Sequence, residues 1–432
     1  MNNVTASREY KLSKRSSYYI FALLFLLYFF DYVDRTIVTS LAPFIQKEWG
    51  LTDTHSGLLM SVVYWSIVAF VFPVSILVDR WSRKRTIGVM ALLWTAATVV
   101  CAFTKTFPQL LVARSAIGIG EAGYAPAGTA MLSGLFPPEK RSRMMGLWNI
   151  SIPLGIAVGI GLGGFIATHW GWRHAFGLVA IPGAIVAILF FFVKDYKTVE
   201  LVKTNDSGNA GQNQVKMSKM DIFREFIHTP SLIFTNLGFV GCVFANNAVI
   251  FWLPSYLHRT TGVSISEAGM KTSVLMILAL IGLPLGGWLA DVWFKKRVTA
   301  RLLFPAITSA LNAIFIFTAI SFLQGQAQYL TLIGMGILAS AFAPAAIIAT
   351  QEVIHPGLRA ISYSICVVVQ NLLGASLAPI VIGKISDLYG IQVAMSILPV
   401  FLLVSALMFF TGSFFYKKDL DNVQKITLEC EN

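Results

Sequence analysis

Charged residues are scarce in this sequence. Asp, Glu, Lys and Arg make up 12% of its 432 residues, whereas an ordinary soluble domain contains about 25%. Cysteine is also rare, and the four cysteines are scattered at positions 101, 242, 366 and 430. That spacing excludes a disulfide framework and a cysteine-based metal site. We therefore expect neither a metal nor a cofactor.

Histidine is equally sparse, and its positions argue against an enzyme. The six histidines fall at the ends of apolar segments or between them, at positions 55, 169, 174, 228, 258 and 355. None of them offers a base or a metal ligand inside an apolar segment. The sequence also lacks the G-x4-G-K-[ST] loop that cradles nucleotide phosphates, which excludes ATP as an energy source used by this chain itself.

Apolar residues are abundant and make up 56% of the chain. They come in blocks of about 20 residues, the length at which a helix crosses a hydrocarbon layer of about 30 Å. The alternating strands of a membrane barrel are absent. The pattern predicts an all-α membrane protein with twelve transmembrane helices, at residues 18–44, 55–78, 86–104, 109–135, 143–168, 173–193, 231–257, 268–290, 299–322, 327–350, 359–383 and 391–416.

The net charge of +12 does not indicate a nucleic-acid partner, because the positive charges are sorted by loop. With a cytoplasmic N-terminus, the tails and the loops on that side carry 25 of the 33 Lys and Arg residues, and the opposite loops carry six. By the positive-inside rule, both termini face the cytoplasm. The first apolar block is too long for a cleavable signal peptide, so we expect a multi-pass protein of the inner or plasma membrane.

The twelve blocks fall into two sets of six. A polar, glycine-containing linker at 194–230 separates them and divides the chain into a tail (1–17), a bundle (18–193), the linker, a second bundle (231–416) and a second tail (417–432). The segments Ser75–Arg85 and Gly287–Arg297 follow the second helix of each set, and in both an Asp precedes a basic run. Matching segments indicate a duplicated transporter with its site between the halves.

Five charged residues interrupt the apolar blocks. Asp31, Asp34 and Arg35 lie in the first block, and Arg114 and Glu121 lie in the fourth. An ionised side chain inside a bilayer costs at least a few kcal/mol, so it persists mainly where it has a partner and lines a cavity. Two such places in one chain are typical of a membrane protein that moves a solute.

Helical spacing limits how these residues pair. Asp31 and Arg35 are four positions apart and share a face, whereas Asp34 points about 100° away from Arg35. Arg114 and Glu121 share a face at roughly 10 Å separation. We expect Asp31 to hold Arg35, and Arg114 to pair with Asp34 or Glu121, a choice that the sequence leaves open. The alternative is an ion-pair network that only fixes helix packing, and for Asp31 it is the favoured interpretation.

The two matching segments resemble the signature loop of the major facilitator superfamily, G-x-L-a-D-r-x-G-r-k. Ser75 and Ser82 replace two of its glycines in the first copy, and Phe294 replaces one in the second. The resemblance spans nearly the whole chain. It implies two pseudo-symmetric six-helix bundles that rock to expose a central site to either side. It also implies a cytoplasmic gate at Asp79, Arg80, Arg83 and Asp291.

Two further motifs narrow this resemblance. Asp31–Arg35 resembles the N-Y-x-D-R motif, and Arg114–Ala122 the R-x6-E-A motif, of the anion:cation symporters and the Spinster-like lipid transporters. The residues of Gly120–Tyr124 and of Ile152–Gly155 resemble the Spinster-like branch more closely. Asp31 stands where those families usually have Asn, and it therefore adds a third carboxyl group.

We expect a proton-coupled secondary transporter for a small organic anion or amphiphilic solute. In this hypothesis Asp34, Glu121 and Asp31 carry protons, and Arg35 and Arg114 set the pKa values of these acids. Both arginines are candidate substrate-binding residues, and Arg114 is the one expected to meet the negative group of the substrate. Desolvation raises the pKa of a carboxyl group and a nearby guanidinium lowers it. An anion that takes the guanidinium then favours protonation of the carboxylate, so substrate and proton bind cooperatively.

Polar and aromatic side chains in the apolar blocks are the other candidate substrate contacts. They are Tyr124, Asn246, Asn247, Gln370 and Asn371. For the four amides, hydrogen bonds to neighbouring helices are an equally good interpretation. Tyr124 can also simply pack, as aromatic residues in membranes more often do.

The substrate and the direction of transport stay open. The symporter resemblance favours import of a sugar acid or carboxylate, the Spinster-like one favours a lysolipid or another amphiphile, and an iron-chelating siderophore is a third alternative. A receptor that senses a ligand without turnover is less favoured, because the tails at 1–17 and 417–432 are short. We expect a monomer, with substrate, protons and the bilayer as partners.

Overall fold

The computed structural model describes residues 12–80, 83–193, 225–355 and 358–423, and every regular element in these ranges is a helix. The N-terminal half holds α1 (Lys14–Trp49), α2 (Asp53–Arg80), α3 (Arg83–Phe103), α4 (Phe107–Glu121), α5 (Tyr124–Leu135), α6 (Pro138–Asn149), α7 (Ser151–Trp170) and α8 (Trp172–Phe191).

The C-terminal half is built in the same way. It holds α10 (Pro230–Thr261), α11 (Ile265–Phe294), α12 (Ala300–Ser321), α13 (Gly325–Ala341), α14 (Ala343–Glu352), α15 (Arg359–Val369), the π-helix η2 (Gln370–Ala375), α16 (Leu377–Tyr389), α17 (Ile391–Ser396) and α18 (Leu398–Asn422). Most of the predicted linker, residues 194–224, lies outside the described residues.

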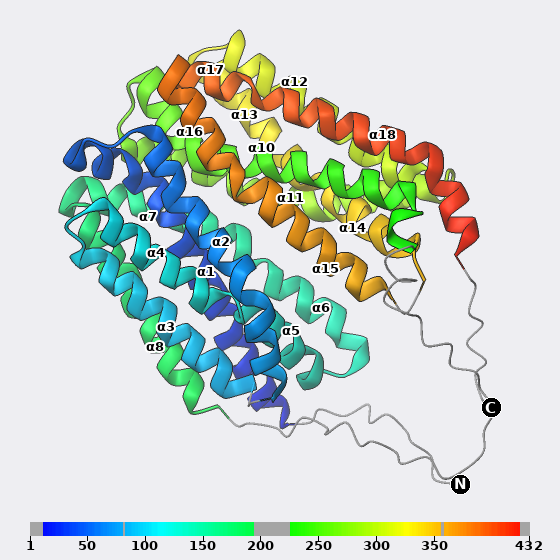
Figure 1. Ribbon diagram of the computed structural model, residues 1–432, viewed down its shortest axis with the longest axis horizontal. Coiled ribbons are helices and arrows are strands. Elements are labelled where there is room, and N and C mark those ends of the chain that lie inside the picture. The colour runs from blue at the N-terminus through cyan, green and yellow to red at the C-terminus, as the bar shows by residue number, and fades with distance from the viewer. Residues whose placement is uncertain (1–11, 81–82, 194–224, 356–357, 424–432) are drawn as a thin grey trace.

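The two halves lie side by side as two groups of long helices (Figure 1). We call the end where α1 begins and α18 ends the proximal end, and the opposite end the distal end. Gly50 ends α1 at the distal end with a φ of 64°, and Gly262 ends α10 there with a φ of 72°. Glycine adopts this left-handed conformation without a steric penalty, so it stops both helices and lets the chain turn back.

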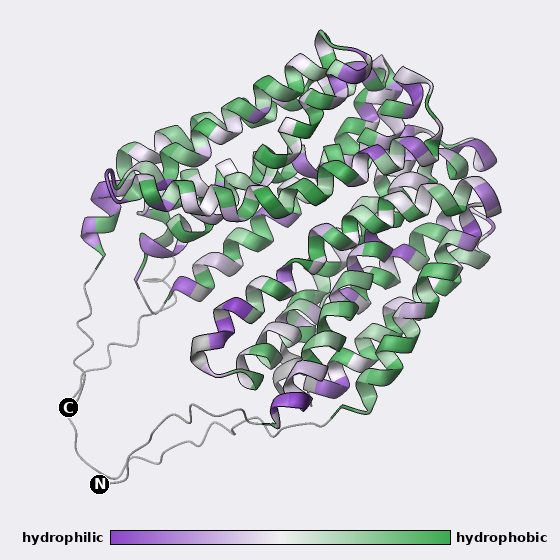
Figure 2. Ribbon diagram, turned by 180° about the vertical axis from the view of Figure 1, so that it is seen from behind, coloured by the Kyte–Doolittle hydropathy of each residue, from purple (hydrophilic) through white to green (hydrophobic). Residues whose placement is uncertain are grey.

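Apolar side chains cover the outside of the bundle. Figure 2 shows hydrophobic residues along the helices and hydrophilic residues gathered toward the helix ends. Large apolar side chains such as Phe72, Phe103 and Phe192 are exposed. Eleven helices or helix pairs in the described ranges are long and apolar enough to cross a membrane. The prediction of an all-α, multi-pass membrane protein is therefore confirmed.

The fourth predicted segment, 109–135, is not one continuous helix. It is divided into α4, with 15 residues, and α5, with 12 residues. Pro126 has no N–H to donate to the carbonyl of Ala122, which ends the ladder of α4. Gly120 and Gly123 at the break also favour a helix less than alanine would, by about 1 kcal/mol each. The fourth predicted segment is therefore present as two short helices separated by a turn at residues 122–123.

The halves meet mainly through two helix pairs, α2 against α16 and α7 against α11. Additional contacts join α1 to α10 and α2 to η2. The first helix of each half thus faces the other half. The charged segment of α1 is therefore placed beside the interface.

Candidate functional site

Arg35 of α1 lies at the centre of a buried charge cluster. Its Nη2 atom is 2.7 Å from Oε2 of Glu121 and 3.2 Å from Oδ2 of Asp31. Its Nε atom also donates to Oε2 of Glu121 at 3.0 Å. One guanidinium therefore holds two carboxylates, one from its own helix and one from the end of α4. The prediction that Asp31 holds Arg35 is confirmed.

Glycines bring Glu121 to this position. A Cβ atom on Gly118 would lie 2.4 Å from the carbonyl oxygen of Val63 in α2, and one on Gly120 would lie 2.7 Å from the backbone nitrogen of Trp94 in α3. Such distances are too short for any side chain, so the two glycines permit the close approach of α4 to α2 and α3. Glu121 is the last residue of α4 and reaches Arg35 from there.

Arg114 is fully buried, at 0% exposed, but it is not held by a carboxylate. Its Nε atom donates to the carbonyl oxygen of Leu59 at 2.7 Å, and its Nη2 atom donates to that of Arg35 at 3.1 Å. Among the described residues it makes no ion pair. The expected pairing with Asp34 or Glu121 is therefore wrong in this structure, because Arg114 donates to backbone carbonyls of α1 and α2 and Glu121 pairs with Arg35.

Asp34 points away from Arg35, as the helical spacing predicts. Its Oδ2 atom accepts a hydrogen bond from the hydroxyl of Thr98 in α3. The same hydroxyl oxygen lies 2.9 Å from the carbonyl oxygen of Trp94, so its single proton is shared between two acceptors. Sequence reasoning missed Thr98, because a threonine in an apolar helix carries no distinctive signal.

Four buried polar atoms in this cluster have no hydrogen-bond partner among the described residues. They are Oδ1 of Asp31, Oδ1 of Asp34, Oε1 of Glu121 and Nη1 of Arg114. A buried acceptor without a donor is costly, and more so when it is charged. A carboxyl group can lower this cost by binding a proton, because the buried group then carries no charge. The cluster therefore has three acids chemically suited to take up protons.

Tyrosines flank Arg35 and connect it to the other half. The guanidinium carbon lies 4.6 Å from the ring centre of Tyr32 and 5.5 Å from that of Tyr64. The hydroxyl of Tyr64 donates to Oδ1 of Asn247 in α10 at 2.9 Å. The structure thus brings the predicted residue Asn247 next to the charge cluster, across the boundary between the halves.

Residues 24–379 match the family model of the Major Facilitator Superfamily. The chain belongs to this superfamily. The hexuronate transporter of Bacillus subtilis (strain 168) is 30% identical over 68% of this chain and 69% of its own length. Protein spinster homolog 1 of Xenopus laevis is 26% identical over 87% of this chain and 74% of its own length.

A solved structure shares the fold of this transporter. It is a bacterial homologue of the human lysosomal transporter Spinster, in an inward-facing and unoccupied conformation. It superposes with a TM-score of 0.83 at 23% identity and covers 94% of this chain and 99% of that one. The protein is therefore a multi-pass membrane transporter of this superfamily, related to Spinster and organic-anion transporters, and not an enzyme.

Other predicted substrate contacts are engaged elsewhere in this conformation of the transporter. Asn246 donates to the carbonyl of Ala339 at 2.8 Å, and Asn371 donates to that of Val367 at 2.8 Å. Gln370 begins the π-helix η2, a kind of helix distortion that is frequent at functional sites. The substrate roles of all three stay predictions.

Tyr124 packs in the interior of the N-terminal half. It is 1% exposed, and its hydroxyl donates to the carbonyl of Leu24. Its ring meets that of Trp94 edge to face at 5.5 Å. These contacts are those of a packing residue, so its role in substrate binding stays a prediction.

The predicted gate is described only in part. Asp291 pairs with Arg301, which also lies 3.3 Å from Glu352 at its Nε atom. Asp291, Arg301 and Glu352 all belong to the C-terminal half and lie at its proximal end. The side chains of Asp79, Arg80 and Arg83 lie outside the described residues.

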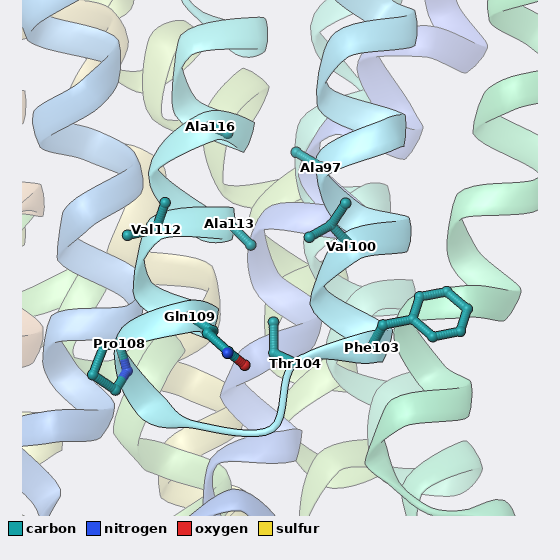
Figure 3. Close-up of a pocket in the computed structure, with 9 residues that line it drawn as sticks. All are labelled: Ala97, Val100, Phe103, Thr104, Pro108, Gln109, Val112, Ala113 and Ala116. Atoms are coloured by element: carbon teal, nitrogen blue, oxygen red, sulfur yellow. The ribbon is translucent and has the colours of Figure 1, made fainter.

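A groove of about 710 Å³ runs between α3 and α4 on the side of the N-terminal half. Figure 3 shows small apolar side chains on its walls, among them Ala97, Ala113 and Ala116. Thr104 and Gln109 are the polar residues of its lining. None of the charged residues described above lines it, so we do not assign it to the transport site.

Proposed function

We propose that this transporter couples the movement of a small organic anion to that of protons. The observation that carries the proposal is the Arg35 bridge, in which one buried guanidinium holds Asp31 and Glu121 while each acid keeps an oxygen without a partner. A guanidinium is permanently charged and binds carboxylates through paired N–H groups. A substrate carboxylate can therefore compete with Glu121 for it.

Competition for Arg35 links substrate and proton. Once the substrate anion takes the guanidinium, Glu121 is left as a buried carboxylate without a counter-charge, and its protonation becomes favourable. The anion and the proton then bind cooperatively, which is the thermodynamic basis of symport. Asp34, hydrogen-bonded by Thr98 rather than paired with a cation, is the second proton carrier in this scheme.

Arg35 is better placed than Arg114 to meet the anion. Arg35 is 8% exposed and lies beside Tyr64 at the boundary between the halves, whereas Arg114 is 0% exposed and holds the backbone of α1 and α2. The sequence suggested Arg114 for this contact. The geometry instead supports Arg35 as the anion-binding group and Arg114 as the residue that positions α1.

A sugar acid is the substrate class that the site favours. Tyr64 and Asn247 place a hydroxyl and an amide next to the guanidinium, and such groups fix polyhydroxylated ligands. The relative at 30% identity is a hexuronate transporter. An amphiphile such as a lysolipid is the second candidate, supported by the similarity to a spinster homologue over 87% of the chain.

Transport by purified protein in liposomes tests the proposal. We expect an inward proton gradient to drive accumulation of labelled D-glucuronate. Glu121→Gln should abolish this accumulation and retain counterflow, since counterflow requires alternating access without coupling. Thr168→Ala, a change in α7 away from the cluster, is the control. If Glu121→Gln and Asp34→Asn both keep the wild-type pH dependence, proton coupling at this site is ruled out.

A parallel assay separates the substrate classes. D-Glucuronate and a labelled lysophosphatidylcholine are offered in the same counterflow experiment. Exchange of the sugar acid alone supports the anion proposal, whereas exchange of the lysolipid alone shows that the second candidate is correct.

We further propose that the proximal end faces the cytoplasm, because the predicted loops on that side carry most of the Lys and Arg residues. An epitope placed after Asn432 should be digested by protease only when the cytoplasmic face is accessible. Digestion in intact cells would reverse this orientation.

A further inference from the structure

A second charged cluster lies at the distal end, far from the Arg35 bridge. Asp53, the first residue of α2, is 6% exposed. Arg259 of α10 grips its carboxylate with two parallel hydrogen bonds, Nη2 to Oδ1 at 2.6 Å and Nη1 to Oδ2 at 2.7 Å. This bidentate geometry makes an arginine–carboxylate pair stronger than a hydrogen bond between neutral groups. It joins the N-terminal half to the C-terminal half.

Neighbouring side chains complete the shell around Asp53. Gln46 of α1 donates to Oδ1 at 2.7 Å and accepts from Arg259 at 3.1 Å. Ser386 of α16 donates to Oδ2. Donors from three helices in both halves therefore converge on one carboxylate. Loss of that carboxylate would leave Arg259 without its charge partner.

The C-terminal half also caps the first turn of α2. Both oxygens of Asp387 accept backbone N–H groups, from Asp53 at 2.7 Å and from Thr54 at 3.0 Å. The first N–H groups of a helix have no partner within the helix, and an acidic side chain there also meets the positive end of the helix dipole. In most helices a residue just before the first turn supplies this cap. Here it comes from α16, so α2 is fully capped only while the halves touch.

Close backbone contact surrounds this cluster. A Cβ atom on Gly57 would lie 2.3 Å from the carbonyl oxygen of Pro379, and one on Gly383 would lie 2.7 Å from that of Asp53. On the other side of the interface, Ser273 of α11 donates to the carbonyl of Ala157 in α7 at 2.6 Å. The two halves therefore touch backbone to backbone at α2–α16 and within hydrogen-bond distance at α7–α11.

The cluster and the central site share the same pair of helices. Tyr64 follows Asp53 by eleven positions on α2, and Asn247 precedes Arg259 by twelve on α10. At about 1.5 Å per residue, the two contacts lie about 17 Å apart along antiparallel helices. A movement that parts α2 from α10 at the distal end therefore also strains the Tyr64–Asn247 contact beside Arg35.

We propose that Asp53, Arg259, Gln46, Ser386 and Asp387 form a distal clamp, which holds the distal side of the transporter closed and must release before the central site opens there. Asp53 and Arg259 are accordingly positioning residues, which act on the equilibrium between conformations and do not touch the substrate. The inference rests on the assignment as a transporter, but it depends neither on proton coupling nor on the identity of the substrate.

A distance measurement between the halves tests the clamp. Spin labels are attached at Lys105 and Gln326, exposed residues at the distal end of each half, after the four native cysteines are replaced. The protein is placed in lipid nanodiscs without substrate, and electron–electron resonance reports the distances. We expect a short distance to dominate in the otherwise unchanged protein. Asp53→Asn should raise the ratio of long to short distances by about tenfold or more, since it removes the buried carboxylate that Arg259 holds across the interface.

Two further variants make the result decisive. Glu48→Gln is the matched control, because Glu48 pairs with Arg173 at the same end at 2.8 Å but within one half, and it should leave the distances unchanged. Gly57→Leu should favour long distances without touching any charge, because its side chain cannot fit against Pro379. Wild-type distances in both Asp53→Asn and Arg259→Gln would overturn the clamp, whatever the transport assays give.

Discussion

Two arginines inside the N-terminal half differ in what holds them. Arg35 bridges two carboxylates and lies beside the interface, whereas Arg114 holds two backbone carbonyls and is sealed in the interior. The helical spacing predicted the pairing of Asp31 with Arg35, since residues four apart meet on a helix face, but it did not predict that Glu121 also pairs with Arg35. Backbone acceptors leave no trace in a sequence, and for that reason the partners of Arg114 were not predictable.

Replacing Arg35 with lysine should weaken substrate binding. A lysine carries a point charge and cannot hold Asp31 and Glu121 through a planar fork. We expect Arg35→Lys to raise the KM for anion uptake by roughly tenfold, the loss of about 1.4 kcal/mol of binding. Arg173→Lys, at the distal surface, is the control and should leave the KM unchanged. An unaltered KM for Arg35→Lys would exclude Arg35 as the anion-binding group.

Replacing Arg114 with lysine should mainly affect stability. Lysine lacks the guanidinium that donates to the carbonyls of Leu59 and Arg35. Hydrogen bonds from a charged group are each worth about 1.5–3 kcal/mol. We expect Arg114→Lys to lower the Tm in detergent while the KM rises less than in Arg35→Lys. The opposite ranking of the two variants, with a larger KM change for Arg114→Lys, would return the anion to Arg114.

At the scale of single elements, the break between α4 and α5 sets the position of Glu121. The apolar composition of 109–135 predicted the segment but not its interruption. The signals were present, because Pro126 removes one backbone donor and Gly120 and Gly123 weaken the helix. The apolar composition and the length of residues 109–135 are nevertheless those of one membrane-spanning helix. Whether such signals end a helix depends on the packing of α4 against α3, which local sequence does not contain.

Filling the space beside Gly120 should destabilise the transporter. A Cβ atom there would meet the backbone of Trp94 at 2.7 Å, so Gly120→Ala pushes α4 away from α3, at a cost of about 1–3 kcal/mol. Gly177→Ala in α8 is the matched control, because its Cβ atom meets nothing within 4 Å. Thermal unfolding followed by fluorescence should show a lower Tm only for Gly120→Ala. Equal Tm values would mean that the α3–α4 contact adjusts freely.

At the scale of the whole molecule, the two halves are joined at the distal end by contacts between distant positions. The apolar blocks and the matching loop segments predicted two bundles with a site between them. The distal clamp was not predictable, since Asp53 and Arg259 are 206 positions apart and each resembles an ordinary residue at a helix end. Contacts of this kind arise only once the halves are folded and docked.

The central claim is that an anion and a proton enter together at Arg35. Calorimetric titration of the purified transporter with D-glucuronate, repeated in buffers of different ionisation enthalpy, counts the protons taken up on binding. The account predicts uptake of a proton by the wild type, an affinity that rises as the pH falls, and no uptake by Glu121→Gln. Binding without proton uptake by the wild type, or the same uptake by Glu121→Gln, would contradict it.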